Sequence, residues 1–108
     1  MDLKILKKAK SWEDMQPGEW FIDPALADQE GRRGANRVDV RCPVCRMRTR
    51  LNPAHSIDAQ GRVHASVLCP KATEEWKQKV AGYKFTVCTW HEFVTLEGWT
   101  PEDAANAR

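Results

Sequence analysis

Apolar and polar residues alternate along several short stretches of this chain, which is the two-residue period of β-strands. The clearest stretches are residues 37–41 and 46–51, where Arg alternates with Val, Met, Thr and Leu. Residues 3–10 fit a short strand and a helical turn equally well. Further strands are expected over residues 19–23, 55–58, 63–68 and 92–96, with a hairpin turn at residues 59–62.

Two short helices are expected among these strands. Residues 73–82 begin with Thr73 as an N-cap, carry acids in the first turn and lysines in the last, and end at Gly82. A second helix begins at the Thr100-Pro101 pair within the C-terminal tail, residues 100–108. Residues 24–36 are polar and Gly-rich, which predicts a mobile loop.

The length of 108 residues allows one small domain, spanning residues 1–108, with one modest core. Hydrophobic residues make up 42% of the chain and charged residues 30%, which indicates a globular protein. Because burial and ordering entropy nearly cancel in so short a chain, a covalent or metal crosslink is expected to hold the fold.

Five side chains with soft donor atoms suit that crosslink. Cys42 and Cys45 enclose a Pro-Val dipeptide between two predicted strands, which is the form of a zinc knuckle. Cys88 and His91 have the same spacing between residues 84–87 and the strand at 92–96. Two such turns facing each other predict a small zinc-ribbon-like domain, mainly β with short helices, in which two knuckles close one metal site.

The sequence offers two candidates for the fourth ligand, His91 and Cys69. The set Cys42, Cys45, Cys88 and His91 pairs two equivalent knuckles and is preferred, which leaves Cys69 as a small buried side chain. The alternative is a site of four thiolates, with Cys69 in place of His91. Either set fills all four tetrahedral positions, so the Zn²⁺ is expected to be structural and the protein not to be an enzyme.

Disulfides and a redox pair are less favoured roles for the cysteines than metal binding. Lysines interrupt the apolar residues near the N-terminus, so no signal peptide is expected, and no segment is apolar enough to cross a membrane. A cytoplasmic location follows as an expectation, and there disulfides are rare. A redox Cys-x-x-Cys pair would begin a helix, whereas this pair lies between predicted strands.

The histidines of the chain do not form a catalytic zinc motif. The sequence His91-Glu92 lacks the second His of a zincin helix, because position 95 is Thr. His55 and His64 are isolated and are interpreted as surface or strand residues.

The basic residues are unevenly distributed although the formal net charge is only +2. Residues 32–50 contain seven arginines and one acid, Asp39. This composition predicts a basic face that contacts a protein partner or, alternatively, the phosphates of a nucleic acid. A solvated strand face without a partner is the plainer interpretation. The residues expected on this face are Arg41, Arg46, Arg48 and Arg50.

Several short motifs together resemble a family of small, uncharacterised zinc-ribbon-like proteins. They are residues 16–20 (Gln-Pro-Gly-Glu-Trp), the Cys42–Cys45 knuckle, residues 66–70 (Ser-Val-Leu-Cys-Pro) and residues 88–94 (Cys-Thr-Trp-His-Glu-Phe-Val). This family occurs in phage genomes and in some bacterial operons, including operons with ubiquitin-like conjugation genes. The resemblance covers residues 15–99 in layout.

The resemblance implies a Cys-x-x-His second knuckle, which supports Cys88 and His91 as ligands. A Ser-Pro or His-Pro turn of the family falls at Cys69-Pro70, where this chain differs, and residues 73–82 correspond to an insertion. No established activity is carried over. The expected function is therefore a non-enzymatic, zinc-stabilised binding module, an accessory or regulatory protein of a phage or mobile element. A structural subunit of a virion or another assembly is an alternative, and the oligomeric state stays open.

Overall fold

The computed structural model of the chain describes residues 3–23, 34–52, 54–69 and 88–107. Its strands are β1 (Ile5–Lys8), β2 (Glu19–Phe21), β3 (Asp39–Arg41), β4 (Arg48–Arg50), β5 (Ser56–Ile57), β6 (Val63–His64), β7 (Val67–Leu68), β8 (His91–Glu92) and β9 (Thr95–Leu96). Its helices are the 3₁₀-helix η2 (Gly34–Arg37) and the α-helix α3 (Pro101–Asn106). The mainly β architecture expected from the alternating pattern is confirmed.

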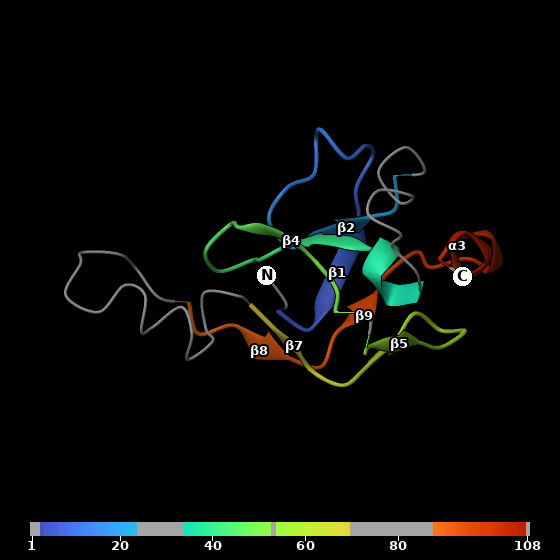
Figure 1. Cartoon of the computed structure of the whole chain (residues 1–108). Coiled ribbons are helices and arrows are strands. Elements are labelled where there is room, and N and C mark those ends of the chain that lie inside the picture. Colours follow the sequence, from blue (N-terminus) through green and yellow to red (C-terminus); the bar gives the residue numbers. More distant parts are fainter. Residues whose placement is uncertain (1–2, 24–33, 53, 70–87, 108) are drawn as a thin grey trace.

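A five-stranded mixed sheet forms the centre of the molecule, with the strand order β4-β3-β2-β1-β9 (Figure 1). β1 runs parallel to both of its neighbours, and β2, β3 and β4 pair antiparallel. Two smaller antiparallel pairs, β5 with β6 and β7 with β8, complete the fold. The first and last described strands therefore lie side by side in one sheet.

The hydrophobic core lies on one face of this sheet. Leu6, Trp20, Val40 and Leu96 point to that face from four adjacent strands and are fully or almost fully buried. The indole of Trp20 donates to the Glu97 carbonyl oxygen over 3.0 Å and lies 5.4 Å from the Trp99 ring, centroid to centroid. These contacts place Trp20 at the centre of the buried residues that lie on the sheet, which form the sheet-side core.

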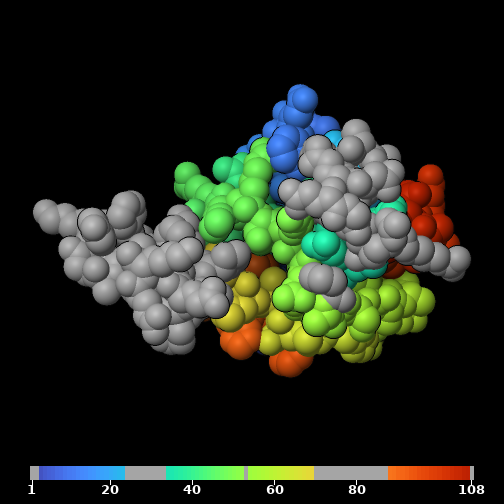
Figure 2. Space-filling view, in the orientation of Figure 1, coloured from blue at the N-terminus to red at the C-terminus, as the bar shows by residue number. Residues whose placement is uncertain are grey.

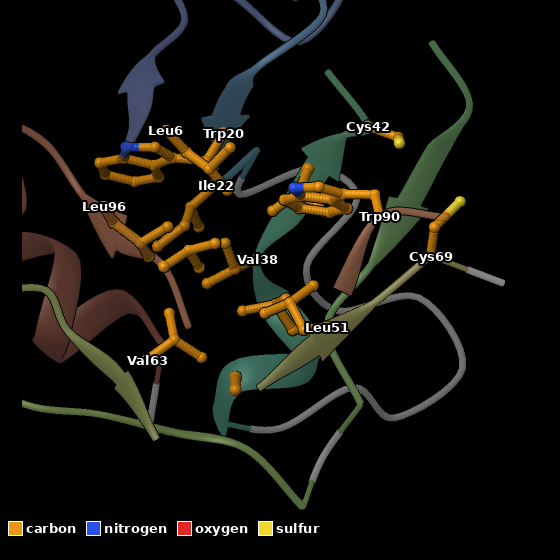
Figure 3. Packing of buried hydrophobic residues seen from close by; sticks show 14 of the residues in the cluster. Leu6, Trp20, Ile22, Val38, Cys42, Leu51, Val63, Cys69, Trp90 and Leu96 are labelled. Carbon is orange, nitrogen blue, oxygen red and sulfur yellow. The ribbon is translucent and has the colours of Figure 1, made fainter. Parts of the chain in front are cut away.

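Trp90 connects this core to the cysteine-bearing part of the molecule. In Figure 3 its ring lies between Val38 and Leu51 on one side and the labelled Cys42 and Cys69 on the other. The ring is 2% exposed, and its Nε1 donates to the Leu3 carbonyl oxygen over 3.2 Å. One continuous cluster therefore contains the apolar core and three of the four cysteines.

The helix α3 begins as the sequence predicts. The Thr100 hydroxyl accepts from the Asp103 N–H, and the Asp103 carboxylate accepts from the Thr100 N–H, which is a capping box. Asp103 is buried and is paired with Lys8 Nζ at 3.1 Å. This ion pair joins the C-terminal helix to β1.

Some expected elements are shorter than the pattern suggests. Within residues 3–10 the structure has the strand β1, Ile5–Lys8, in place of the alternative helical turn. The strand expected at 63–68 divides into β6 and β7, because Ala65 between them has a left-handed backbone (φ 64°). The strand expected at 92–96 likewise divides into β8 and β9. Residues 34–36, at the end of the expected loop 24–36, belong to η2. The remainder of that loop and the expected helix 73–82 lie outside the described residues.

Candidate metal centre

Cys42 and Cys45 lie in a tight turn between β3 and β4, where the sequence predicts the first knuckle. The Cys42 N–H donates to the Met47 carbonyl oxygen over 2.9 Å, and the Arg46 N–H donates to the Cys42 carbonyl oxygen over 3.0 Å. The Cys45 N–H also approaches the Cys42 sulfur at 3.4 Å. These bonds hold both sulfur atoms on the same side of the turn.

The second pair of cysteines flanks the antiparallel strands β7 and β8. Cys69 directly follows β7, and its N–H donates to the Trp90 carbonyl oxygen over 3.0 Å. Cys88 precedes β8, and its sulfur accepts from the Trp90 N–H over 3.4 Å. Residues 70–87 connect these two cysteines along the chain. The second pair, Cys69 and Cys88, thus consists of two positions distant in sequence that the pairing of β7 with β8 brings together, and it differs from the predicted Cys88–His91 knuckle.

The four cysteine sulfurs lie within 4.8 Å of one another. The Cys42 and Cys88 sulfurs are 3.6 Å apart, and the Cys45 and Cys69 sulfurs are 3.5 Å apart. A tetrahedral ion with metal–sulfur bonds of about 2.3 Å places its sulfur atoms roughly 3.8 Å apart. A disulfide would need about 2.05 Å, and none of the four cysteines forms one in the structure. The arrangement can therefore hold a metal ion.

The thiols differ in exposure and in proton affinity. Cys42, Cys69 and Cys88 are buried, whereas Cys45 is partly exposed. Burial raises the pKa of Cys42 to about 11, against hydrogen bonds from the Cys45 and Val44 amides that lower it. Burial also opposes ionisation of Cys45, but the Met47 amide and the surrounding thiols outweigh it and lower its pKa. In the metal-free site Cys42 holds its proton at neutral pH, so a bound metal must displace that proton.

His91, the preferred fourth ligand in the sequence interpretation, lies outside this cluster, and the structure brings Cys69 there instead. His91 is exposed on β8, opposite Leu68, and its Nε2 is 2.5 Å from the Ser66 hydroxyl oxygen. The reason is strand alternation: Trp90 points into the core, so its neighbour His91 points away from it. A sequence signal for Cys69 was present, since Cys69-Pro70 repeats the dipeptide Cys42-Pro43.

The structure also places the predicted arginines differently from the row that the sequence predicts. Only Arg48 and Arg50 lie on β4, because Arg46 belongs to the knuckle turn. Arg41 donates to the carbonyl oxygens of Arg46 and Met15, over 2.9 and 2.8 Å. The guanidiniums of Arg41 and Arg48 therefore bond to carbonyl oxygens within the chain.

Arg48 holds the segment before β2 against the sheet. Its guanidinium donates to the carbonyl oxygens of Trp12 and Glu13, over 2.6 and 3.0 Å, and lies 4.8 Å from the centroid of the Trp12 ring. Figure 2 shows the blue N-terminal segment next to the green residues of the first knuckle. Arg48 thus has a structural role, and Arg46 and Arg50 are the exposed members of the predicted basic face.

The two isolated histidines make local contacts, as a surface or strand role implies. Both ring nitrogens of His55 lie 3.0 Å from carbonyl oxygens, those of Asn52 and Ser66. His64 Nε2 is 3.0 Å from the Asp58 carboxylate. Neither histidine is part of the cysteine cluster.

Comparison with protein-family models, with curated proteins and with solved structures finds no match to this chain. No helix in the described part of the chain has the length and apolar character needed to cross a membrane. The chemical interpretation of the site therefore depends on its geometry.

Arg46 occupies a backbone conformation that favours glycine, with φ at 68° directly after the second cysteine of the knuckle. For a residue with a side chain this left-handed conformation costs roughly 1–2 kcal/mol, which glycine avoids. Glycine is also more flexible in the unfolded state, and this offsets part of the stability gained by the substitution. We expect Arg46→Gly to raise the free energy of unfolding by about 0.5–1 kcal/mol in urea denaturation of the metal-loaded protein.

Ala65→Gly is the matched control for this backbone effect, because Ala65 is exposed and has nearly the same φ, 64°. It should stabilise the fold by a similar amount, whereas Arg46→Ala keeps the strained backbone and should not. A loss of stability in Arg46→Gly would show that the side chain contributes more than its backbone strain costs.

Proposed function

We propose that this protein is a non-enzymatic binding module whose fold is held by one structural Zn²⁺ on Cys42, Cys45, Cys69 and Cys88. The observation that carries the proposal is the close approach of four cysteine sulfurs from two antiparallel strand pairs, all within 4.8 Å. Thiolate ligands in a tetrahedral arrangement favour zinc over the harder divalent ions, which prefer oxygen ligands.

Four protein ligands support a structural rather than a catalytic role for the metal. Catalytic zinc sites leave one position for water or substrate, whereas four thiolates occupy the whole tetrahedron. Three of the four cysteines belong to the buried cluster that also contains Trp90 and Leu51. The ion would thus join the two halves of the hydrophobic core.

We assign the binding role to a protein partner, as an accessory or regulatory protein of the phage or mobile-element kind that the sequence motifs resemble. The exposed Arg46 and Arg50 supply the basic part of the surface. A nucleic-acid interface is less well supported, because the Arg48 guanidinium bonds to backbone carbonyl oxygens of the chain and the surface next to the arginines carries Asp14 and Glu19.

A subunit of a larger assembly is a second candidate, favoured by exposed apolar side chains. Phe93 is 70% exposed, and Ile5, Leu68 and Val44 are each at least 39% exposed. A monomer by size-exclusion chromatography and light scattering at high protein concentration would argue against self-assembly.

Cobalt substitution tests the proposed metal site. The wild-type protein should show the intense visible absorption of tetrahedral Co²⁺–thiolate coordination, and purified protein should contain one zinc per chain. Cys69→Ser should lower metal affinity by more than the roughly 100-fold that loss of a second-shell partner causes.

His91→Ala is the control, since His91 contacts Ser66 rather than the cysteines. It should leave the cobalt spectrum unchanged. A spectrum altered by His91→Ala and insensitive to Cys69→Ser would restore the Cys-x-x-His knuckle, and absence of metal from all samples would overturn the proposal.

A further inference from the structure

A surface pocket of about 490 Å³ lies beside the first knuckle and is lined by basic and rigid residues. Its walls are Gln16, Pro17, Arg41, Pro43 and Arg46. The two prolines each restrict the backbone where it lines the pocket, and one of them, Pro43, lies between Cys42 and Cys45. The shape of the pocket is thus tied to the knuckle.

Arg41 is held in place within this pocket. Its Nε donates to the Arg46 carbonyl oxygen and its Nη1 to the Met15 carbonyl oxygen. Within the described part of the chain these bonds use two of the five N–H donors of the guanidinium, so three remain for a ligand. A guanidinium that is already oriented loses little conformational entropy when it binds an anion.

Arg46 adds a second positive charge from an exposed and strained position. Its φ of 68° is one that glycine adopts more easily, yet the chain places a long cationic side chain there. Strained backbone of this kind is concentrated at binding and catalytic sites. Two arginines on one pocket form a good receptor for a carboxylate or phosphate group.

The neighbouring surface distinguishes between these anions. A second pocket, of about 360 Å³, shares Gln16 with the first and is lined by Lys10, Asp14, Gln16 and Glu19. Its two carboxylates outnumber its one cation. A polyanion such as a nucleic acid would meet these carboxylates where it extended from the arginines over Gln16, whereas a peptide with an acidic and a basic side chain would complement both pockets.

We propose that the Arg41–Arg46 pocket binds an acidic side chain of a partner protein, with a basic side chain of the same segment over Asp14 and Glu19. The inference deepens the proposed function, on which it rests, by naming the surface and the chemistry of the partner. Loss of one charge-assisted hydrogen bond of this kind is expected to weaken binding by about tenfold or more.

The test uses the full-length, zinc-loaded chain and the capped peptide Ac-Glu-Ala-Ala-Lys-NH₂, followed by ¹H–¹⁵N NMR including the Arg41 Nε–H signal. We expect saturable shifts at Arg41, Gln16 and Arg46 with a millimolar dissociation constant. Replacing Glu in the peptide by Gln, or Arg46 by Gln in the protein, should weaken binding by about tenfold or more.

Arg62→Gln removes the same charge from an exposed arginine outside the pocket and serves as the control. Arg62→Gln should leave the affinity for the peptide unchanged. Glu19→Gln tests the second pocket and should reduce the preference of the protein for a peptide with Lys rather than Ala in its last position. Arg46→Gly should stabilise the fold and still lose binding, which separates recognition from stability.

Three results would overturn the proposal: no shifts at the pocket with tens of millimolar peptide, an equal loss in Arg62→Gln, or tighter binding of a short oligothymidylate at the same residues. Because the cobalt spectrum is measured on the same samples, the two proposals can fail separately. A four-thiolate spectrum without peptide binding removes only the pocket, and peptide binding without a four-thiolate spectrum removes only the zinc assignment.

Discussion

Removal of the metal is expected to unfold this domain. The apparent free energy of binding structural Zn²⁺ is about 10–16 kcal/mol at neutral pH, which is comparable to or larger than the roughly 5–15 kcal/mol that stabilises a typical small protein. Three of the four cysteines lie in the core with Trp90, so their release opens the cluster that also holds Leu51 and Val67.

The measurement is near-ultraviolet circular dichroism and tryptophan fluorescence during titration with a zinc chelator. Loss of the near-ultraviolet signal, reversed by an excess of zinc, is the expected result, with added calcium as the control for a general effect of divalent ions. A chelated, zinc-free protein that keeps its native spectrum would contradict a structural role of the metal.

The same coupling gives the direction of the pH dependence. Burial raises the pKa of Cys42 to about 11 from the ordinary 9.0, so the metal-free fold prefers the protonated thiol at neutral pH. Each bound proton competes with the metal, and acidification should therefore release zinc and unfold the domain. Zinc release followed with a chromogenic chelator should increase as the pH falls, and a constant affinity would exclude thiolate ligation.

The second large effect is expected at Trp20. Trp20→Ala should lower the free energy of unfolding by about 3–5 kcal/mol, because it leaves a large cavity in a buried site. The substitution also removes the hydrogen bond to the Glu97 carbonyl oxygen and the contact with the Trp99 ring. Urea denaturation of the metal-loaded protein measures this change.

Trp12→Ala is the matched comparison, because Trp12 is partly exposed and contacts the Arg48 guanidinium at the surface. Its cost should stay near 1 kcal/mol, the usual value for a cation–π contact at an exposed site. Trp20→Phe should lie between the two. Equal costs for Trp20→Ala and Trp12→Ala would show that the sheet-side core contributes less than its burial suggests.

Local features of the chain could be predicted from the sequence because they depend on neighbouring residues. The Cys42–Cys45 turn, the strands on either side of it and the capped helix beginning at Pro101 all follow from residue type and spacing within a few positions. Even here the strand was predicted too long, since Arg46 is needed in a left-handed conformation to close the knuckle.

The sequence by itself determined that this is a small, mainly β chain with enough clustered cysteines to bind a metal. The tertiary structure alone decided which residues meet. Cys69 and Cys88 are brought together by the pairing of β7 with β8, and the same pairing directs His91 outward because Trp90 takes the core side. Likewise, Arg41 and Arg48 bond to a segment near Trp12 and Met15 that lies far away in sequence. Such partners depend on long-range strand register, which a local pattern of residues does not contain.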